Sequence, residues 1–419
     1  MKKKFIYAAA LILFLAAGFY MPHEASAVPA FARQTGMACN SCHFQHFPTL
    51  NVFGRSFKAG GYTMIGGQSM VEGDFLSIPA VLNASLTTKI RFQKRDGDNA
   101  DPSSTSGDRD LNKGQVQFPD EAAIHLGGRA GEHIGFLLEA SLKDSNTSTT
   151  MFTSYKTVFV FDAADTKINI IPFTTDGLGA SYGLELLNTG ASRHMRPLEH
   201  RTQTSAQQYI GTDGAATGLT FAAVHSMGFA NYTMWYPVKG DASTGPFLHY
   251  ARAAVTPTVA GWDLGFGGQW WGGTDKRGDG AGAVREHADA WALDAQAQGT
   301  AGNFPLGVYL TYAKAKKSKT AIDTEANIFN SSTARDKSAW TATAELGVVP
   351  NRLTVSAAYR GGKKGTAGND TDNAATLGLN YNPTQNLEVQ LNHSWFSGEA
   401  GPTSAEGDML TTVMIFAAF

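Results

Sequence analysis

An alternation of apolar and polar residues with a period of two runs through most of this chain. Between residues 81 and 92 the apolar positions are Leu82, Ala84, Leu86, Ile90 and Phe92. The positions between them carry Asn83, Ser85, Thr87, Lys89 and Arg91. The pattern returns at 134–143, 353–359 and 387–393. Because successive side chains of a strand point to opposite faces, it predicts β-strands with one apolar and one polar face.

The connectors between these strands alternate in length. Short turns occupy 349–351 and 382–386, whereas long polar loops occupy 95–113, 272–287, 314–337 and 361–373. This asymmetry is typical of outer-membrane barrels, which have short periplasmic turns and longer external loops. No stretch after residue 27 approaches the roughly 20 continuous apolar residues that a transmembrane helix needs, so a membrane-spanning mature chain must cross as a barrel.

The barrel is expected to occupy residues 78–419. About 340 residues, at roughly 20 to 22 for each strand with its connector, predict about 16 antiparallel strands, since bacterial barrels prefer an even count. The last strand alternates and ends on the aromatic Phe419, which resembles the recognition signal of outer-membrane barrel proteins. A soluble β-sandwich shares the alternation and is the competing fold. The predicted fold class is an all-β transmembrane outer-membrane barrel with a small N-terminal helical segment.

The first 27 residues have the layout of a secretory signal peptide. Three lysines precede an apolar run from Phe5 to Tyr20, and the small residues Ala25, Ser26 and Ala27 follow. We predict cleavage after Ala27; an uncleaved membrane anchor is the alternative, but the apolar run is short for a full span. The chain has 34 basic and 36 acidic residues, a balance that argues against a nucleic-acid partner.

The only two cysteines, Cys39 and Cys42, stand in the sequence Cys-Asn-Ser-Cys-His that ends at His43. Covalent attachment of a c-type haem needs two thiols that reach the vinyl groups and an adjacent imidazole that binds the iron. A redox dithiol and half of a zinc site are the competing interpretations, but the chain has no second cysteine pair to complete four zinc ligands. We therefore predict one covalent haem c on Cys39 and Cys42, with His43 as the proximal iron ligand.

The sixth ligand of the haem iron is open among several side chains. Met64 ranks first, His46 second and Met70 third, and an open or water-bound position is a further alternative. Met64 and Met70 follow a pair of glycines and can fold back over the opposite haem face. His46 lies on the same helical face as His43 unless the chain turns between them, and Met37 is close to the attachment point. A methionine ligand would raise the haem potential relative to a second histidine.

A short helix is expected from near Pro48 to the glycines at 60–61. Its apolar stripe, which we expect to form much of a haem face, consists of Leu50, Phe53 and Phe57. Arg55 and Lys58, on the polar side, would either pair with the haem propionates or be solvated. A segment of about 45 residues buries little core by itself. We therefore predict that the haem segment, 28–77, docks in or at the periplasmic mouth of the barrel as a plug.

The N-terminal sequence resembles a known family. The run 29–39, from Pro29 to Cys39, and the later Cys42, His43, Pro48, Leu50, Asn51, Phe53, Gly54, Arg55, Phe57, Lys58, Gly61 and Tyr62 resemble the fused cytochrome-porins of iron-oxidising bacteria. The N-terminal match is specific, whereas the barrel matches in pattern only. The resemblance assigns haem attachment to Cys39, Cys42 and His43 and names no further catalytic residue.

The resemblance implies an outer-membrane Fe(II) oxidase. Fe(II) would be oxidised at or near the outer surface, and single electrons would pass through the haem to a soluble periplasmic cytochrome or a similar carrier. Because Fe(III) precipitates away from acid, oxidation outside keeps mineral out of the cell. An Fe(II) site would use oxygen or imidazole ligands. The first long loop offers five aspartates that either attract the cation or are simply solvated, namely Asp96, Asp98, Asp101, Asp108 and Asp110.

Two other functions compete with iron oxidation. An extracellular electron conduit would use the same parts, because the sequence does not fix the direction of electron flow or the donor. A diffusion porin gated by its haem segment would be a protein without redox function. The plug argues against this alternative, because it would obstruct the pore. Passage of solutes without reduction of the haem by Fe(II) would support the gated porin.

Overall fold

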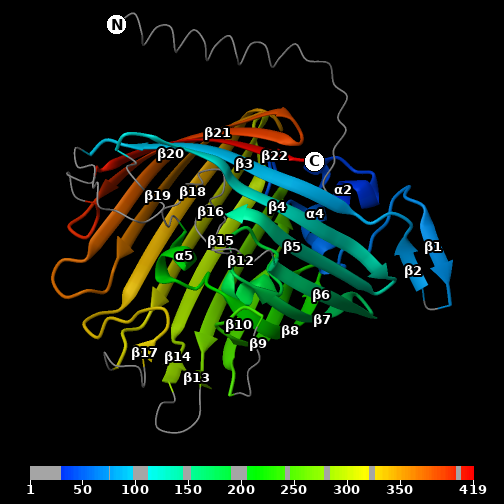
Figure 1. Ribbon diagram of the computed structural model, residues 1–419, viewed down its shortest axis with the longest axis horizontal. Helices are drawn as coiled ribbons and strands as arrows, with labels where there is room; N and C mark the ends of the chain where they lie inside the picture. Colours follow the sequence, from blue (N-terminus) through cyan, green and yellow to red (C-terminus); the bar gives the residue numbers. More distant parts are fainter. Residues whose placement is uncertain are drawn as a thin grey trace, which may run out of the picture.

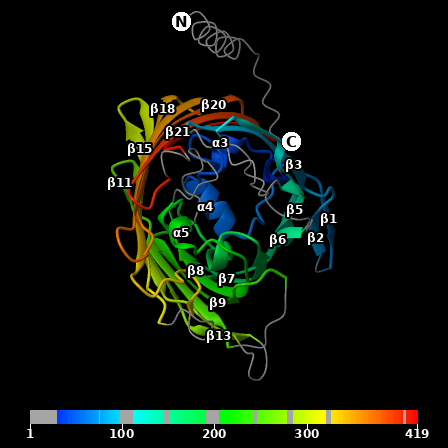
Figure 2. The same ribbon diagram turned by 60° about the vertical axis from the view of Figure 1, so that its left-hand side comes forward.

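The protein forms a closed antiparallel β-barrel (Figures 1 and 2). The computed structural model describes residues 30–74, 76–97, 112–144, 152–189, 205–240, 246–277, 284–319, 326–402 and 407–419, so the predicted signal peptide lies outside the described residues. The closed sheet contains 17 strands, one of which, β11 (Thr258–Val259), is a two-residue piece beside a directly paired β10 and β12. The wall therefore has 17 − 1 = 16 strands, which confirms the predicted count.

Each wall strand pairs with its neighbours in the sequence, and the last strand closes on the first. The wall strands are β3 (Ala84–Arg95), β4 (Gln115–Gly131), β5 (Ile134–Asp144), β6 (Phe152–Ala163), β7 (Thr166–Thr175), β8 (Ala216–His225), β9 (Gly228–Tyr236), β10 (Leu248–Val255), β12 (Trp262–Gly272), β15 (Ala290–Ala301), β16 (Phe304–Ala315), β18 (Lys337–Val349), β19 (Leu353–Lys363), β20 (Thr371–Thr384), β21 (Leu387–Ser397) and β22 (Met409–Ala418).

The alternation of the sequence places polar residues inside the barrel and apolar residues outside. On β18, Thr343 and Glu345 are buried in the lumen, whereas Trp340 is 46% exposed on the outer surface. On β3, Arg91 is buried inside and Phe92 faces out. This is the reverse of a soluble protein and is the arrangement of a transmembrane β-barrel, whose outer surface contacts lipid.

A row of aromatic side chains crosses five neighbouring wall strands on the outer surface. Trp270 of β12 stands opposite Trp291 of β15, whose ring lies 5.3 Å from that of Tyr312 on β16. Tyr312 stands opposite Trp340 of β18, which lies 5.1 Å from Tyr359 on β19. Aromatic girdles of this kind mark the membrane interface of transmembrane barrels.

The connectors differ between the two ends of the barrel, as predicted. At one end the turns are short, for example 350–352 between β18 and β19. At the other end the connections are long, for example 273–289 and 316–336, which contribute the small sheet of β13 (Thr274–Arg277), β14 (Val284–His287) and β17 (Ala326–Asn327). No helix among the described residues is long and apolar enough to cross a membrane.

The boundary between the N-terminal segment and the barrel was predicted between residues 77 and 78. That point lies inside β2 (Leu76–Pro79), which pairs with β1 (Met70–Gly73) in a hairpin beside the wall (Figure 1). The first wall strand, β3, begins at Ala84, where its pairing with β4 begins. The alternating residues 81–83 therefore lie before the barrel wall. The boundary thus needs to move a few residues toward the C-terminus.

Residues 30–69 are named the plug below, because part of this segment lies within the ring of strands (Figure 2). Three short helices belong to this segment, namely α2 (Ala30–Thr35), α3 (Cys39–Cys42) and α4 (Val52–Ala59). Figure 2 shows α3 and α4 within the ring of strands. The plug contacts the wall in several directions: the backbone of Ala59 accepts a hydrogen bond from Asn169 of β7 at 2.9 Å, and the Phe47 ring stacks on Phe416 of β22.

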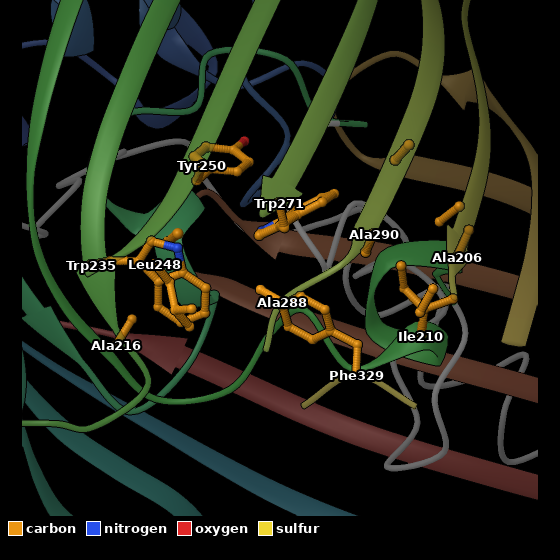
Figure 3. Close-up of a cluster of buried hydrophobic side chains, with 14 of the residues drawn as sticks. Ala206, Ile210, Ala216, Trp235, Leu248, Tyr250, Trp271, Ala288, Ala290 and Phe329 are labelled. Atoms are coloured by element: carbon orange, nitrogen blue, oxygen red, sulfur yellow. The ribbon is translucent and has the colours of Figure 1, made fainter. Parts of the chain in front are cut away.

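A second segment also enters the lumen, and the sequence had not indicated it. The connection between β7 and β8 carries the 3₁₀ helix η1 (Gly179–Tyr182) and α5 (Ala206–Ile210), and α5 contacts β16, β18 and β19 across the barrel. Its apolar residues join side chains of the wall in one buried cluster (Figure 3), which includes Ile210, Trp235, Trp271, Ala290 and Phe329. The lumen therefore holds a second segment besides the plug.

Candidate haem-attachment site

The attachment motif forms a single helical turn at the plug. α3 spans Cys39–Cys42, and His43 follows it in an extended conformation with its backbone N–H bonded to Cys39 O at 3.0 Å. Both cysteines are half-buried and neither is in a disulfide. Burial raises the pKa of both thiols, and the neighbouring Cys39 adds to the effect at Cys42. Two unpaired thiols one turn apart suit attachment to a single ring.

The imidazole of His43 is oriented by one backbone carbonyl. Its Nδ1 donates to the oxygen of Thr49 at 3.2 Å, because a carbonyl only accepts. That bond leaves Nε2 as the nitrogen with a lone pair, as in metal-bound histidines whose other ring nitrogen donates to a carbonyl. Burial lowers the pKa of His43 to about 4, although the bond to Thr49 opposes the effect. The ring is therefore neutral, the form that binds a metal.

Exposed apolar side chains gather next to the motif. Met37 is 36% exposed and Phe53 38% exposed, and the ring of Phe47 lies 5.3 Å from that of His43. Val52, at the start of α4, is 52% exposed. Exposed apolar groups that lie together mark a ligand or partner surface, whereas single ones are ordinary. A haem held at His43 would cover this face, so the residues present fit the group that the motif implies.

The helix that follows is held against the motif by its own residues. α4 begins at Val52 rather than near Pro48, because Asn51 caps it: its side chain accepts from Gly54 N at 2.9 Å. Asn51 also donates to the backbone of Cys42 at 3.0 Å. Gly54 is required here, since a Cβ at this position would lie 2.2 Å from Cys42 O. The predicted apolar stripe of Leu50, Phe53 and Phe57 does not face one surface. Phe57 is buried against the wall, whereas Phe53 is exposed.

The structure gives the two basic residues of α4 partners in the barrel. Arg55 donates to both carboxylate oxygens of Asp263 on β12, at 2.6 and 2.7 Å. Lys58 Nζ donates to the backbone of Glu185 at 2.6 Å, and burial lowers the pKa of Lys58 despite the nearby Glu185 charge. Neither side chain is free for a haem propionate, so that interpretation of Arg55 and Lys58 is replaced by a role in docking the plug.

His46 is engaged at both ring nitrogens. Nδ1 donates to the carbonyl of Phe47 at 2.8 Å, and Nε2 lies 2.8 Å from Glu345 on β18. Burial alone would lower the pKa of His46, but the charge and hydrogen bond of Glu345 overcome it and raise the pKa to about 9. As it lies in the structure, His46 offers no lone pair to an iron, which weakens it as the distal ligand.

The methionines considered as distal ligands lie at different places. Met64 and Met37 each have a side chain that is 36% exposed, and both belong to the plug. The Met64 carbonyl accepts from Gln34 Nε2 at 2.7 Å, so the chain near Met64 runs back along α2. Met70 begins β1 of the hairpin beside the wall. Met64 as the distal ligand stays a prediction.

The acidic loop suggested for Fe(II) capture is described only at its two ends. Asp96 accepts a hydrogen bond from the backbone of Met409 at 2.9 Å. Asp98, Asp101, Asp108 and Asp110 lie outside the described residues. Among the residues that the structure describes, no group of three or more histidine, cysteine, aspartate or glutamate side chains is placed to hold a metal ion.

Several buried charges in the lumen were not identified from the sequence. Glu345 and Asp263 of the wall hold the plug. Arg252 of β10 joins Glu185 of the inward segment, at 3.0 Å, to Asp294 of β15, at 2.6 Å. The sequence carried one signal for the wall residues: Arg252, Asp263, Asp294 and Glu345 are charged at positions of the polar strand face where most other residues are neutral. Their partners lie too far away in the sequence to be paired by pattern.

These features define a transmembrane β-barrel with a polypeptide plug that carries the sequence Cys-Asn-Ser-Cys-His at residues 39–43. No protein-family model matches the chain, and no curated protein sequence matches it. Among solved structures, the chain is similar to OmpT of Vibrio cholerae, with 10% identity, a TM-score of 0.47, and 84% of this chain and 100% of that one covered.

Two further solved structures give similar values. The outer membrane channel DcaP of Acinetobacter baumannii is 10% identical, with a TM-score of 0.48 over 81% of this chain and 97% of that one. OmpF of Salmonella typhi, in a complex with daunomycin, is 14% identical, with a TM-score of 0.48 over 84% and 100%. Likeness at this level says nothing about the plug or its chemistry.

Proposed function

We propose that the protein is an outer-membrane cytochrome-porin that oxidises extracellular Fe(II). Single electrons would pass from Fe(II), which becomes Fe(III), through one haem c on the plug to a periplasmic electron carrier. The observation that carries the proposal is the position of Cys39, Cys42 and His43 inside a membrane barrel. The sequence resemblance to cytochrome-porins of iron-oxidising bacteria supplies the substrate.

The roles of the chain's residues follow from the site. The thiols of Cys39 and Cys42 would hold the haem, and His43 would bind its iron through Nε2 while Thr49 fixes the ring. Haem c, when attached, supplies a one-electron couple at its iron. The exposed side chains of Phe47 and Phe53 would help to exclude water from the bound haem. The alternating barrel supports an outer-membrane location, with the short turns in the periplasm.

The second segment inside the lumen argues against a simple diffusion porin. Leu184 and Leu187 of the inward segment are each 2% exposed, and Glu185 is paired with Arg252. A solute would have to pass this segment as well as the plug. Electron transfer needs no open pore, so a lumen that holds two packed segments suits a redox function better than a gated channel.

The test is the visible spectrum of the purified protein under argon, before and after addition of Fe(II). Prompt appearance of the reduced haem bands is expected. A double variant, Cys39→Ala with Cys42→Ala, serves as the control and should show neither covalent haem nor the bands. If the haem is reduced by dithionite but stays oxidised with Fe(II), iron is not the donor, and a conduit for another donor or a gated porin takes the place of this proposal.

A further inference from the structure

The turn that follows the haem motif is tightly closed by its own backbone. His43 and Leu50 face each other in an isolated bridge. The N–H of Phe44 donates to Thr49 O at 2.8 Å, the same oxygen that accepts from His43 Nδ1. The Thr49 hydroxyl donates to the backbone of His46 at 2.9 Å. The ring of His43 is therefore oriented by a turn of seven residues, 43–49, rather than by a helix.

A buried ion pair joins this turn to the barrel wall. His46 Nε2 lies 2.8 Å from a Glu345 oxygen, with side-chain exposures of 1% and 0%. The other Glu345 oxygen accepts from the hydroxyl of Tyr309 on β16 at 2.6 Å, and that hydroxyl accepts from Gln298 of β15 at 3.0 Å. Both ring nitrogens of His46 face acceptors, so both carry protons and the ring is a cation beside a carboxylate.

Two further contacts join this turn to the barrel, and neither involves a charged group. Next to His46, the Phe47 ring lies 5.3 Å from the His43 ring on one side and 5.3 Å from Phe416 of the wall on the other. Gln45, before His46, accepts from the backbone N–H of Asn351 at 3.1 Å. A buried, charge-assisted bond restricts geometry more strongly than an exposed one. Loss of Glu345 would leave the turn held by weaker contacts.

We infer that Glu345, supported by Tyr309, is a positioning residue for the proximal haem ligand: by fixing His46 it sets the orientation of the His43 ring relative to the barrel. This inference rests on the proposed attachment of haem at Cys39, Cys42 and His43. It extends that proposal from the plug to the wall, since Glu345 of β18 would orient the ring of His43, about 300 positions earlier in the chain, through its bond to His46.

The test compares three variants of the full chain. Glu345→Ala removes the acceptor, Glu345→Gln keeps an acceptor oxygen without the charge, and Glu388→Ala removes another nearby carboxylate that also acts on His46 through its charge. The measurements are the electron paramagnetic resonance of the ferric haem, which reports ligand orientation, and the haem midpoint potential measured by dithionite titration. Neither measurement requires Fe(II) to be the donor.

Glu345→Ala should keep its covalent haem but show a broadened or divided ferric signal and a shifted midpoint potential. Glu345→Gln and Glu388→Ala should shift the potential while the ferric signal stays single, as in the wild type. A wild-type signal and potential in Glu345→Ala would overturn the inference. If that variant does not accumulate, Tyr309→Phe removes the hydroxyl that donates to Glu345 and accepts from Gln298, and an unchanged signal there would overturn the inference equally.

A measurement without haem separates this inference from the proposed function. In the background of Cys39→Ala with Cys42→Ala, Glu345→Ala should speed hydrogen exchange of the Phe44 and His46 amides at least tenfold, whereas Glu388→Ala should not. Equal exchange in the two variants would refute the fastening. A wild-type protein without covalent haem would instead refute the proposed function, and the exchange result would still decide whether Glu345 fixes the turn.

Discussion

Removal of Asp263 should release the plug from one side of the barrel. Arg55 of α4 and Asp263 of β12 form two parallel bonds at 2.6 and 2.7 Å, with side-chain exposures of 7% and 11%. Asp263→Ala leaves the guanidinium buried without its carboxylate. Breaking a buried pair in this way costs about 3–5 kcal/mol. Since about 1.4 kcal/mol is a tenfold change, opening of α4 should become roughly 100-fold to 5,000-fold more frequent.

Hydrogen exchange in detergent micelles measures this opening directly, because a segment that opens by itself exchanges at its own rate. The amides of α4 should lose protection in Asp263→Ala while the wall strands keep theirs. Asp162→Ala is the matched control, since Asp162 and Lys167 form a pair that is 55% and 41% exposed, and exposed pairs contribute little to stability. Unchanged protection of α4 in Asp263→Ala would refute the idea that the pair holds the plug.

Three further predictions concern the plug. Cys42→Ala should leave haem attached through Cys39 alone and shift the pyridine haemochrome band, and an unshifted band would place the attachment elsewhere. Met64→Ala should convert the ferric haem from low spin to high spin, with Met70→Ala as the control; a low-spin spectrum in Met64→Ala would exclude it as the distal ligand. Because the pKa of His46 is raised from 6.5 to about 9, its pairing with Glu345 should stabilise the docked turn fully below pH 6.5 and be lost as the pH rises through about 9. Glu345 and Glu388 of the wall and His43 of the plug are the titratable groups that act on His46. Exchange protection of the Phe44 amide, corrected for intrinsic rates, checks this, and constant protection from pH 6 to 10 would contradict it.

The barrel wall was predictable because its physics is local. In lipid, one strand face must be apolar, so residues such as Leu86 and Phe92 alternate with Ser85 and Arg91 and the period appears in the sequence. The haem motif was equally local, since Cys39, Cys42 and His43 are neighbours. Strand number followed from the chain length because every strand must cross the same thickness.

The contents of the lumen were not predictable in the same way. The contacts of Arg55 with Asp263 and of His46 with Glu345 join residues 208 and 299 positions apart. No periodicity within a segment encodes such pairs. The β7–β8 connection has the length of an external loop, yet Leu184 and Ile210 are buried inside the barrel. Its placement depends on the space that the wall and the plug leave, which exists only in the folded protein.

Electron transfer across a membrane without passage of iron is the most direct test of the proposed function. Proteoliposomes would enclose an oxidised soluble c-type cytochrome in one preparation and an Fe(II)-specific chromogenic chelator in another, with Fe(II) added outside under argon. The trapped cytochrome should be reduced while the trapped chelator stays colourless, and the variant Cys39→Ala with Cys42→Ala should give neither signal. Coloured chelator would show that iron itself passes through the barrel, and an oxidised trapped cytochrome would show that electrons do not; either result would contradict an iron-oxidising cytochrome-porin.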